Sequence, residues 1–306
     1  MKKLIIVLVL IGAALTMAFT NTAVLKFVAH NFIYNKEVLV QSKNEYYKSD
    51  HYSFVEKSDN LFVENKQDVL NILFTNINNG EREFHFFCAY TYDMCEDHIS
   101  KIAKDPETLT NINNFVHPFN TYESLRITIN GLGRVTVVSN PLYTDEQIEE
   151  INLWVDNVLE DKVNDNMSLR RQLLTIHDHI IRSTTYDNLR ADAITRGEKI
   201  LGNHSHIAYG IVSEGRAVCG GYTDLMAIFL ERFGINNFKI SSEDHIWNYV
   251  EYNGEWFHLD LTWNDPQAED GRQILLHDFF LITTEDLEAF NTGQHIYDKN
   301  VFTLAN

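Results

Sequence analysis

Residues 245–262 read HIWNYVEYNGEWFHLDLT, and this stretch predicts a two-stranded antiparallel hairpin. Two runs rich in aromatic and β-branched residues flank Asn253-Gly254, and Asn-Gly between such runs is the strongest short hairpin signal. A two-residue turn fixes the register, so that Tyr252 pairs with Glu255. The strands are expected to extend to the two ends of the stretch.

His245 and Asp260 fall on the same face of this hairpin. Side chains alternate between the faces of a strand, and in this register Asp260 is the diagonal neighbour of His245. A carboxylate on the imidazole Nδ1 would fix the tautomer and stabilise the imidazolium, which leaves the other nitrogen for a nucleophile. The opposite face is apolar and suited to core packing, with Ile246, Val250, Phe257, Leu259 and Leu261.

Cys219 is the candidate nucleophile. It precedes a run with apolar residues at helical spacing that Gly234 ends, so we expect it at or just before the first turn of a helix. The free N–H groups and the positive dipole end at that position stabilise a thiolate. Gly220 and Gly221 allow another chain segment to approach closely. Taken alone, Cys219 would be an inert core cysteine and His245 an ordinary strand histidine, but Cys, His and Asp together suit thiol acyl chemistry.

Three motifs, in the order in which they occur along the chain, resemble those of the transglutaminase-like superfamily, in its bacterial extracytoplasmic branch. They are AVCGGY at 217–222, DHIWN at 244–248 and WFHLDLTWNDP at 256–266. The family's nucleophile, base and orienting carboxylate match Cys219, His245 and Asp260. The resemblance covers roughly residues 165–290. It implies an α+β fold with a papain-like core, in which a Cys-bearing helix packs on an antiparallel sheet that presents His and Asp.

The resemblance leaves the oxyanion donors and any metal to be considered. The backbone N–H of Cys219 is the default oxyanion donor, and Tyr209 and Tyr222 are candidates for a second one. The sequence has no acidic loop with calcium-ligand spacing. His204 and His206 have no Cys or acidic partner at the spacing of a metal site, so a solvated loop is the simpler interpretation. We therefore expect neither a metal nor another cofactor.

The N-terminus predicts export from the cytoplasm. Lys2 and Lys3 precede an uncharged apolar run over residues 4–19, which suits either a secretory signal or an uncleaved membrane anchor. We assign residues 1–26 to this segment. The two lysines would stay inside, so the rest of the chain is expected outside, secreted or membrane-anchored.

The three cysteines agree with an oxidising compartment. An odd number outside the cytoplasm suggests one pair and one free thiol. Cys88 and Cys95 are close enough in sequence to bridge a loop, which would leave Cys219 unpaired. The alternative is that all three are small buried apolar residues.

Two regions follow the N-terminal segment. Residues 27–140 are expected to form a small α+β region of unassigned role. Its elements would be a helix over 66–77, a strand over 83–90 and a hairpin with strands 125–129 and 134–138. Residues 141–306 would form the catalytic domain, opening with helices capped by Thr144 and Ser168.

Charge limits the partners of this 306-residue chain. A net charge of −18 opposes binding to nucleic acid or to an anionic membrane surface, so the N-terminal segment would supply the only membrane contact. The predicted partner is a protein or peptide substrate whose amide forms a thioester with Cys219. Because the surface is acidic and no acceptor site is visible, we favour a cysteine peptidase or amidase. The alternatives are a crosslinking transglutaminase and a non-catalytic binding or scaffold module of the cell envelope.

Overall fold

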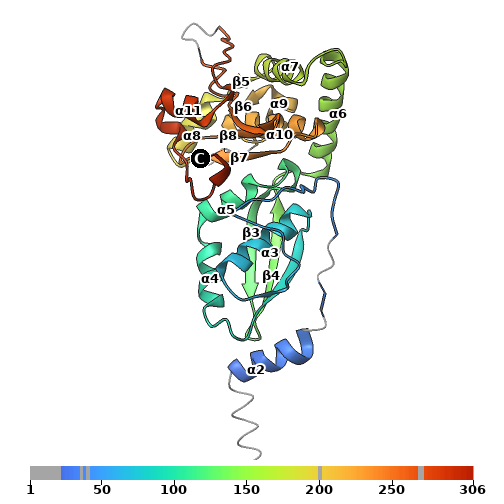
Figure 1. Cartoon of the computed structure of the whole chain (residues 1–306), viewed down its shortest axis with the longest axis vertical. Coiled ribbons are helices and arrows are strands. Elements are labelled where there is room, and N and C mark those ends of the chain that lie inside the picture. The colour runs from blue at the N-terminus through green and yellow to red at the C-terminus, as the bar shows by residue number, and fades with distance from the viewer. Residues whose placement is uncertain (1–21, 35–36, 39–41, 199–201, 268–271, 306) are drawn as a thin grey trace, which may run out of the picture. The chain divides into compact units, whose positions relative to one another are not determined.

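The computed structural model of the chain has an α+β fold (Figure 1), as predicted. The residues that it describes are 22–34, 37–38, 42–198, 202–267 and 272–305. The predicted apolar run over residues 4–19 lies outside them. Among the described residues, no helix combines the length and the apolar character that crossing a membrane requires. The chain divides into two compact units, which are described separately.

The first unit is built on a four-stranded sheet. It comprises the described residues up to His51, Val55–Ile112 and Tyr122–Pro141. The strand order is β1-β2-β4-β3, with β1 parallel to β2 and the other pairs antiparallel. The strands are β1 (Phe62–Val63), β2 (Glu83–Cys88), β3 (Tyr122–Ile129) and β4 (Arg134–Pro141). The predicted 125–138 hairpin is therefore present and extends further at both ends.

The helical segments that begin in this part of the chain are short, apart from α3. They are α2 (Thr22–Val28), η1 (Ala29–Ile33), α3 (Lys66–Asn78), α4 (Cys95–Ala103) and α5 (Pro106–Asn114). Helix α3 begins where predicted because the Asn65 side chain accepts a hydrogen bond from the Asp68 N–H. Cys88 ends β2 and Cys95 begins α4, and the two form a disulfide. The predicted pairing is confirmed, and Cys219 is a free thiol.

The second unit carries the three predicted site residues. It comprises Tyr52–Phe54, Asn113–Thr121 and the described residues from Leu142 onward. Its four-stranded antiparallel sheet has the order β10-β9-β8-β7. The strands are β7 (Asn237–Ser241), β8 (Ile246–Tyr252), β9 (Glu255–Leu259) and β10 (Phe280–Ile282). A separate parallel pair consists of β5 (Thr185–Tyr186) and β6 (Arg216–Ala217).

Six α-helices and three short 3-10 turns accompany these strands in the described part of this unit. The α-helices are α6 (Asp145–Lys162), α7 (Leu169–Arg182), α8 (Asn188–Thr195), α9 (Ala208–Glu214), α10 (Cys219–Arg232) and α11 (Thr284–Phe290). The 3-10 turns are η3 (Pro118–Asn120), η4 (Gly293–His295) and η5 (Thr303–Ala305). Thr144 and Ser168 cap α6 and α7, as predicted, by accepting hydrogen bonds from N–H groups in the first turn.

The 245–262 hairpin has the predicted register but shorter strands. Tyr252 pairs with Glu255, and Asn253 and Gly254 have φ values of 55° and 82°, as a type I′ turn requires. The expectation that the strands reach both ends of the stretch is wrong. Strand β9 ends at Leu259 because the chain turns away there, and the Asp260 N–H instead donates to the Phe279 carbonyl oxygen at 3.0 Å.

Helix α10 packs on β8 (Figure 1), and side-chain hydrogen bonds join the two elements. The Thr223 hydroxyl donates to the Ile246 carbonyl oxygen at 2.9 Å, and the Asn248 amide donates to the Thr223 carbonyl oxygen at 3.0 Å. These bonds hold the N-terminal part of α10, which begins with Cys219, against β8. The packing is that of a Cys-bearing helix on an antiparallel sheet.

Candidate active site

Cys219 is the first residue of α10, and its side chain is half-buried. The preceding residue, Val218, is extended, and its N–H donates to the Ser205 carbonyl oxygen at 2.8 Å. The two glycines after Cys219 explain how the chain before α9 lies so close. A Cβ atom on Gly220 would stand 2.6 Å from the His206 carbonyl oxygen, and one on Gly221 would stand 2.8 Å from that of Ser205.

His245 and Asp260 form a buried pair. The imidazole Nε2 lies 2.6 Å from Asp260 Oδ2, and both side chains are almost fully buried. The expectation that the carboxylate binds Nδ1 is wrong: it binds Nε2. The nitrogen left for a nucleophile is therefore Nδ1. The choice is made by the rotation of the ring, which sequence spacing does not determine.

Electrostatics in this pair favour the doubly charged state. Burial by itself lowers the pKa of His245, but the charge and hydrogen bond of Asp260, together with the neighbouring Cys219 side chain, raise it to about 10. Burial would likewise raise the pKa of Asp260, but the two imidazoles around it hold that pKa below its usual range. The structure thus brings the side chains of Cys219, His245 and Asp260 together, and the raised pKa of His245 favours its charged form at neutral pH.

The second imidazole belongs to His295, which sequence reasoning missed. Its Nε2 lies 3.0 Å from Asp260 Oδ2, the oxygen that His245 also contacts. The other carboxylate oxygen accepts the Trp263 N–H at 3.1 Å. His295 lies beyond the region that resembles the family, and no motif or spacing marks it. Only the path of the C-terminal segment brings it to the site.

Another histidine, His258, is neutral and orients the tryptophan ring that stacks on His245. The Trp247 indole N–H donates to His258 Nδ1 at 2.9 Å, and its ring stacks on His245 with centroids 5.6 Å apart. Burial, followed by the charge of His295, lowers the pKa of His258 to about 3. His258 is therefore an uncharged acceptor that orients Trp247, and through it the plane of the His245 ring.

A cleft of about 1210 Å³ opens beside the sulfur. The charged side chains among its lining residues are both acidic, Glu243 and Asp244, while Trp263 and Ile296 give it apolar surface. Its full lining is Tyr186, Ala191, Ile194, Thr195, Val218, Cys219, Glu243, Asp244, Trp263, Thr292, Gly293, Gln294 and Ile296. The cleft is large enough for several residues of an extended peptide.

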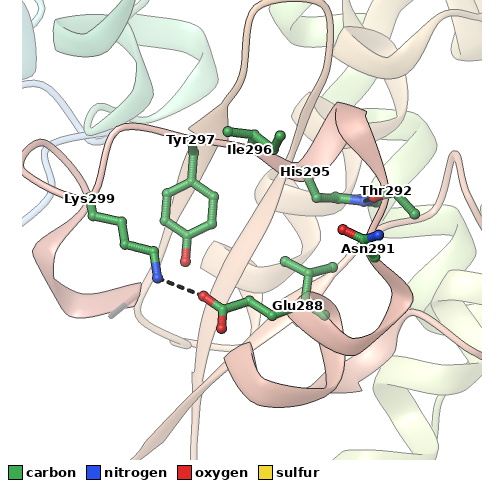
Figure 2. A pocket seen from close by; sticks show the side chains of 8 residues that line it. Glu288, Asn291, Thr292, His295, Ile296, Tyr297 and Lys299 are labelled. Atoms are coloured by element: carbon green, nitrogen blue, oxygen red, sulfur yellow. Dashed lines mark hydrogen bonds and ion pairs between the residues drawn. The ribbon is translucent and has the colours of Figure 1, made fainter.

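A smaller pocket of about 250 Å³ lies along the segment that carries His295 (Figure 2). The Lys299 ammonium and the Glu288 carboxylate are ion-paired in its wall at 2.6 Å, as the dashed line in Figure 2 marks. Thr292 and Ile296 line both this pocket and the cleft. The C-terminal segment therefore forms part of the wall beside Cys219.

The two candidates for a second oxyanion donor are engaged elsewhere. The Tyr222 hydroxyl donates to Asp265 at 2.5 Å, and the Tyr209 hydroxyl donates to Glu150 at 2.9 Å. Neither hydroxyl is free to serve Cys219, so these two expectations are wrong. Of the three tyrosines Tyr186, Tyr209 and Tyr222, it is Tyr186 that lines the cleft. Burial raises its pKa to about 12, and the charge of Cys219 adds to the shift.

Two clusters in the described residues place potential metal ligands together. In one, the Asn264 amide donates to His177 Nε2 at 2.9 Å, while its oxygen accepts the Phe279 N–H. His177 must then carry its proton on Nδ1, where it donates to Asp178 at 3.0 Å, so no lone pair remains for a metal. The third member, His277, donates to the same Asp178 carboxylate.

The other cluster consists of His245, Asp260 and His295. Both histidines direct Nε2 at one carboxylate oxygen, at 2.6 Å and 3.0 Å. An imidazole N–H that donates to a carboxylate offers no lone pair in that direction. Both clusters are therefore suited to hydrogen bonding rather than to metal coordination.

Comparison with known proteins returns partial matches in structure. No model of a known protein family matches the sequence, and no curated protein matches it. A solved structure described as that of a TGase aligns over 46% of this chain and 45% of its own, at 14% identity and a TM-score of 0.34. A Cytophaga hutchinsonii protein provisionally classed as a cysteine protease aligns over 50% and 65%, at 12% identity and a TM-score of 0.28.

These descriptions name the classes that the sequence motifs resemble. Each match spans less than two thirds of the matched chain.

Proposed function

We propose that this protein is a transglutaminase-like thiol enzyme that transfers acyl groups from protein or peptide carboxamides. The observation that carries the proposal is the buried 2.6 Å contact between the His245 imidazole and the Asp260 carboxylate, next to the Cys219 side chain at the wall of an open cleft. A scaffold would have no need to keep an imidazolium buried beside a thiol, because burying charge is costly.

The roles follow from position. The Cys219 thiolate attacks the carbonyl carbon, and the backbone N–H at the start of α10 stabilises the oxyanion that forms. The His245 imidazolium gives its proton to the leaving amine, the C–N bond breaks, and a thioester remains on Cys219. Neutral His245 then takes a proton from water, the hydroxide attacks the thioester, and the acid and the thiol are released. Asp260 holds the ring and offsets its charge throughout.

Hydrolysis is the favoured outcome. Water reaches the open cleft beside Cys219 freely, so it is the acceptor that the geometry favours. A crosslinking reaction would replace water with a lysine amine at the same thioester. We also propose that the protein acts outside the cytoplasm, secreted or anchored by its N-terminal segment, where its disulfide would be stable.

The test is a product analysis. The full chain is incubated with a peptide library and an equimolar primary amine, and products are identified by mass spectrometry. We expect hydrolysed amides and an acyl adduct on Cys219, both absent in Cys219→Ala. Amine-linked product in excess would favour the crosslinking enzyme. No turnover, together with alkylation of Cys219 at pH 6 no faster than a model thiol, would contradict the proposal.

A further inference from the structure

One oxygen of Asp260 accepts hydrogen bonds from two imidazoles. Oδ2 lies 2.6 Å from Nε2 of His245 and 3.0 Å from Nε2 of His295, and Oδ1 accepts the Trp263 N–H. Without His295, the only partner of Oδ2 would be the imidazole that it has to orient, and one backbone N–H at Oδ1 would be left to resist rotation about the Cβ–Cγ bond. We propose that His295 is a positioning residue that keeps Oδ2 directed at His245. The inference rests on the proposed function, since it assigns His295 to the same site.

His295 is itself held in a single orientation. Its Nδ1 is hydrogen-bonded to the Thr292 hydroxyl, and its ring stacks on Phe279 with centroids 5.3 Å and planes 17° apart. Trp247 packs against the His295 ring in a T-shaped arrangement, with the ring centroids 4.9 Å apart. Because a carboxylate only accepts, Nε2 carries a proton and donates to Asp260, whichever way the contact with Thr292 runs. The ring is therefore a fixed donor.

Simple core packing does not require a histidine here. The side chain is only 2% exposed and is surrounded by Phe279, Trp247 and Trp263, a set that a phenylalanine would also satisfy. A buried imidazole costs free energy unless its polar atoms are paired. Both nitrogens are paired, and one of the partners is the Asp260 carboxylate. The pairing of both nitrogens thus indicates that His295 serves as a hydrogen-bond donor to Asp260 and not only as a packing residue.

The chain path connects this donor to the cleft. His295 ends η4, and the three residues before it, Thr292, Gly293 and Gln294, line the cleft beside Cys219. The C-terminal segment therefore contributes both a wall for the substrate and a support for the carboxylate. Full alignment of the His245 imidazolium depends on this segment being in place.

The test compares His295→Phe with His295→Gln in the full-length protein. Phenylalanine keeps the aromatic packing and removes the donor, whereas the glutamine amide can place a donor near the position of Nε2. The probe is iodoacetate, whose carboxylate is attracted by the His245 imidazolium, so that its rate with Cys219 falls when the imidazolium loses its proton. Iodoacetamide, which is neutral, controls for access to the sulfur. Cys219 is the only free thiol once the disulfide is formed.

We expect His295→Phe to slow the iodoacetate reaction about tenfold at a pH on its alkaline limb, the size of effect expected from losing a hydrogen bond to a charged group. In the pH–rate profile of this variant, the alkaline limb should move to lower pH by about one unit, because a misdirected carboxylate stabilises the imidazolium less. His295→Gln should restore both readouts to within about twofold of wild type. If the phenylalanine variant does not fold, His295→Asn replaces it, because that amide is too short to reach Asp260.

The possible outcomes are distinguishable. A wild-type pH–rate profile in His295→Phe, or in His295→Asn where it replaces that variant, overturns the positioning role of His295. An alkaline limb that moves to higher pH also overturns it, because His295 would then only withdraw charge from Asp260. Failure of glutamine to restore the profile also overturns it. If wild-type Cys219 shows no enhanced rate and no alkaline limb, the proposed function itself fails.

Discussion

His245 and Asp260 each lie one residue outside the paired strands of their hairpin, immediately before β8 and immediately after β9, with side-chain atoms 2.6 Å apart. Inside the ladder, their separation would be set by the sheet. Outside it, the backbone of Asp260 is held by Phe279 and its carboxylate by Trp263 and His295. The hairpin brings the pair close, and the C-terminal part of the chain fixes the contact.

Replacing Asp260 with Asn should remove most of the activity. The amide carries no charge, so the pKa of His245 is expected to fall from about 10 toward or below its ordinary value because burial would then dominate. General acid catalysis at neutral pH should weaken by at least about a hundredfold. The measurement is kcat/KM on the peptide identified in the product analysis. Asp165→Asn, on an exposed residue, is the control and should match wild type.

The same pair gives stability a pH dependence with a definite sign. The folded-state pKa of His245 is above its unfolded value of 6.5, so its contribution is fully present below pH 6.5 and is lost as pH rises through about 10. The free energy of unfolding should therefore decline in this alkaline window, measured by urea denaturation at each pH. His245→Gln should flatten that decline, and an equal decline in this variant would contradict the assignment.

His258 should make the protein sensitive to acid. It is neutral in the fold, with a pKa lowered to about 3, whereas the unfolded chain binds a proton below pH 6.5. Stability should fall as pH drops from 6.5 toward 3, by up to about 1.4 kcal/mol per pH unit for this one proton. His258→Asn keeps an acceptor for Trp247 and should reduce the slope, whereas His51→Asn, at an exposed position, should not.

Asp224 is expected to be the most sensitive charged residue of the buried core. It accepts hydrogen bonds from the Lys239 ammonium at 2.9 Å and from the Tyr143 hydroxyl at 2.6 Å, and all three residues are buried. Asp224→Asn leaves the Lys239 charge without a counterion and should cost about 3–5 kcal/mol of unfolding free energy.

The matched control for Asp224 is another ion pair of the same unit. Asp156 lies 3.3 Å from Arg232, with both side chains exposed, and Asp156→Asn should cost less than about 1 kcal/mol. Equal losses for the two substitutions, measured by urea denaturation, would show that burial does not govern the effect.

Gly220 should tolerate no side chain. A Cβ at this position would stand 2.6 Å from the His206 carbonyl oxygen, a backbone atom that cannot swing aside. Gly220→Ala should therefore lower the unfolding free energy by about 1–3 kcal/mol and displace the first turn of α10, reducing the reactivity of Cys219. Gly131→Ala is the control, because nothing lies within 4 Å of its Cβ position. Wild-type stability and reactivity in Gly220→Ala would contradict the close approach.

Local sequence determined the elements that bear the candidate site. Asn253-Gly254 set the hairpin register because their backbone readily adopts positive φ, and Thr144 and Ser168 started helices because their side chains satisfy free N–H groups. The position of Cys219 at the start of α10 follows from the apolar periodicity after it. Each of these features depends on residues a few positions apart, so each could be predicted from the sequence.

Tertiary packing decided the details of the site. The use of Nε2 rather than Nδ1 depends on how the His245 ring is packed against Trp247, and the engagement of Tyr222 depends on the placement of Asp265, 43 residues away. His295 reaches Asp260 from 35 residues along the chain. Ring rotation and the meeting of distant segments are set by side-chain packing across the folded unit, and no spacing rule along a single chain encodes them.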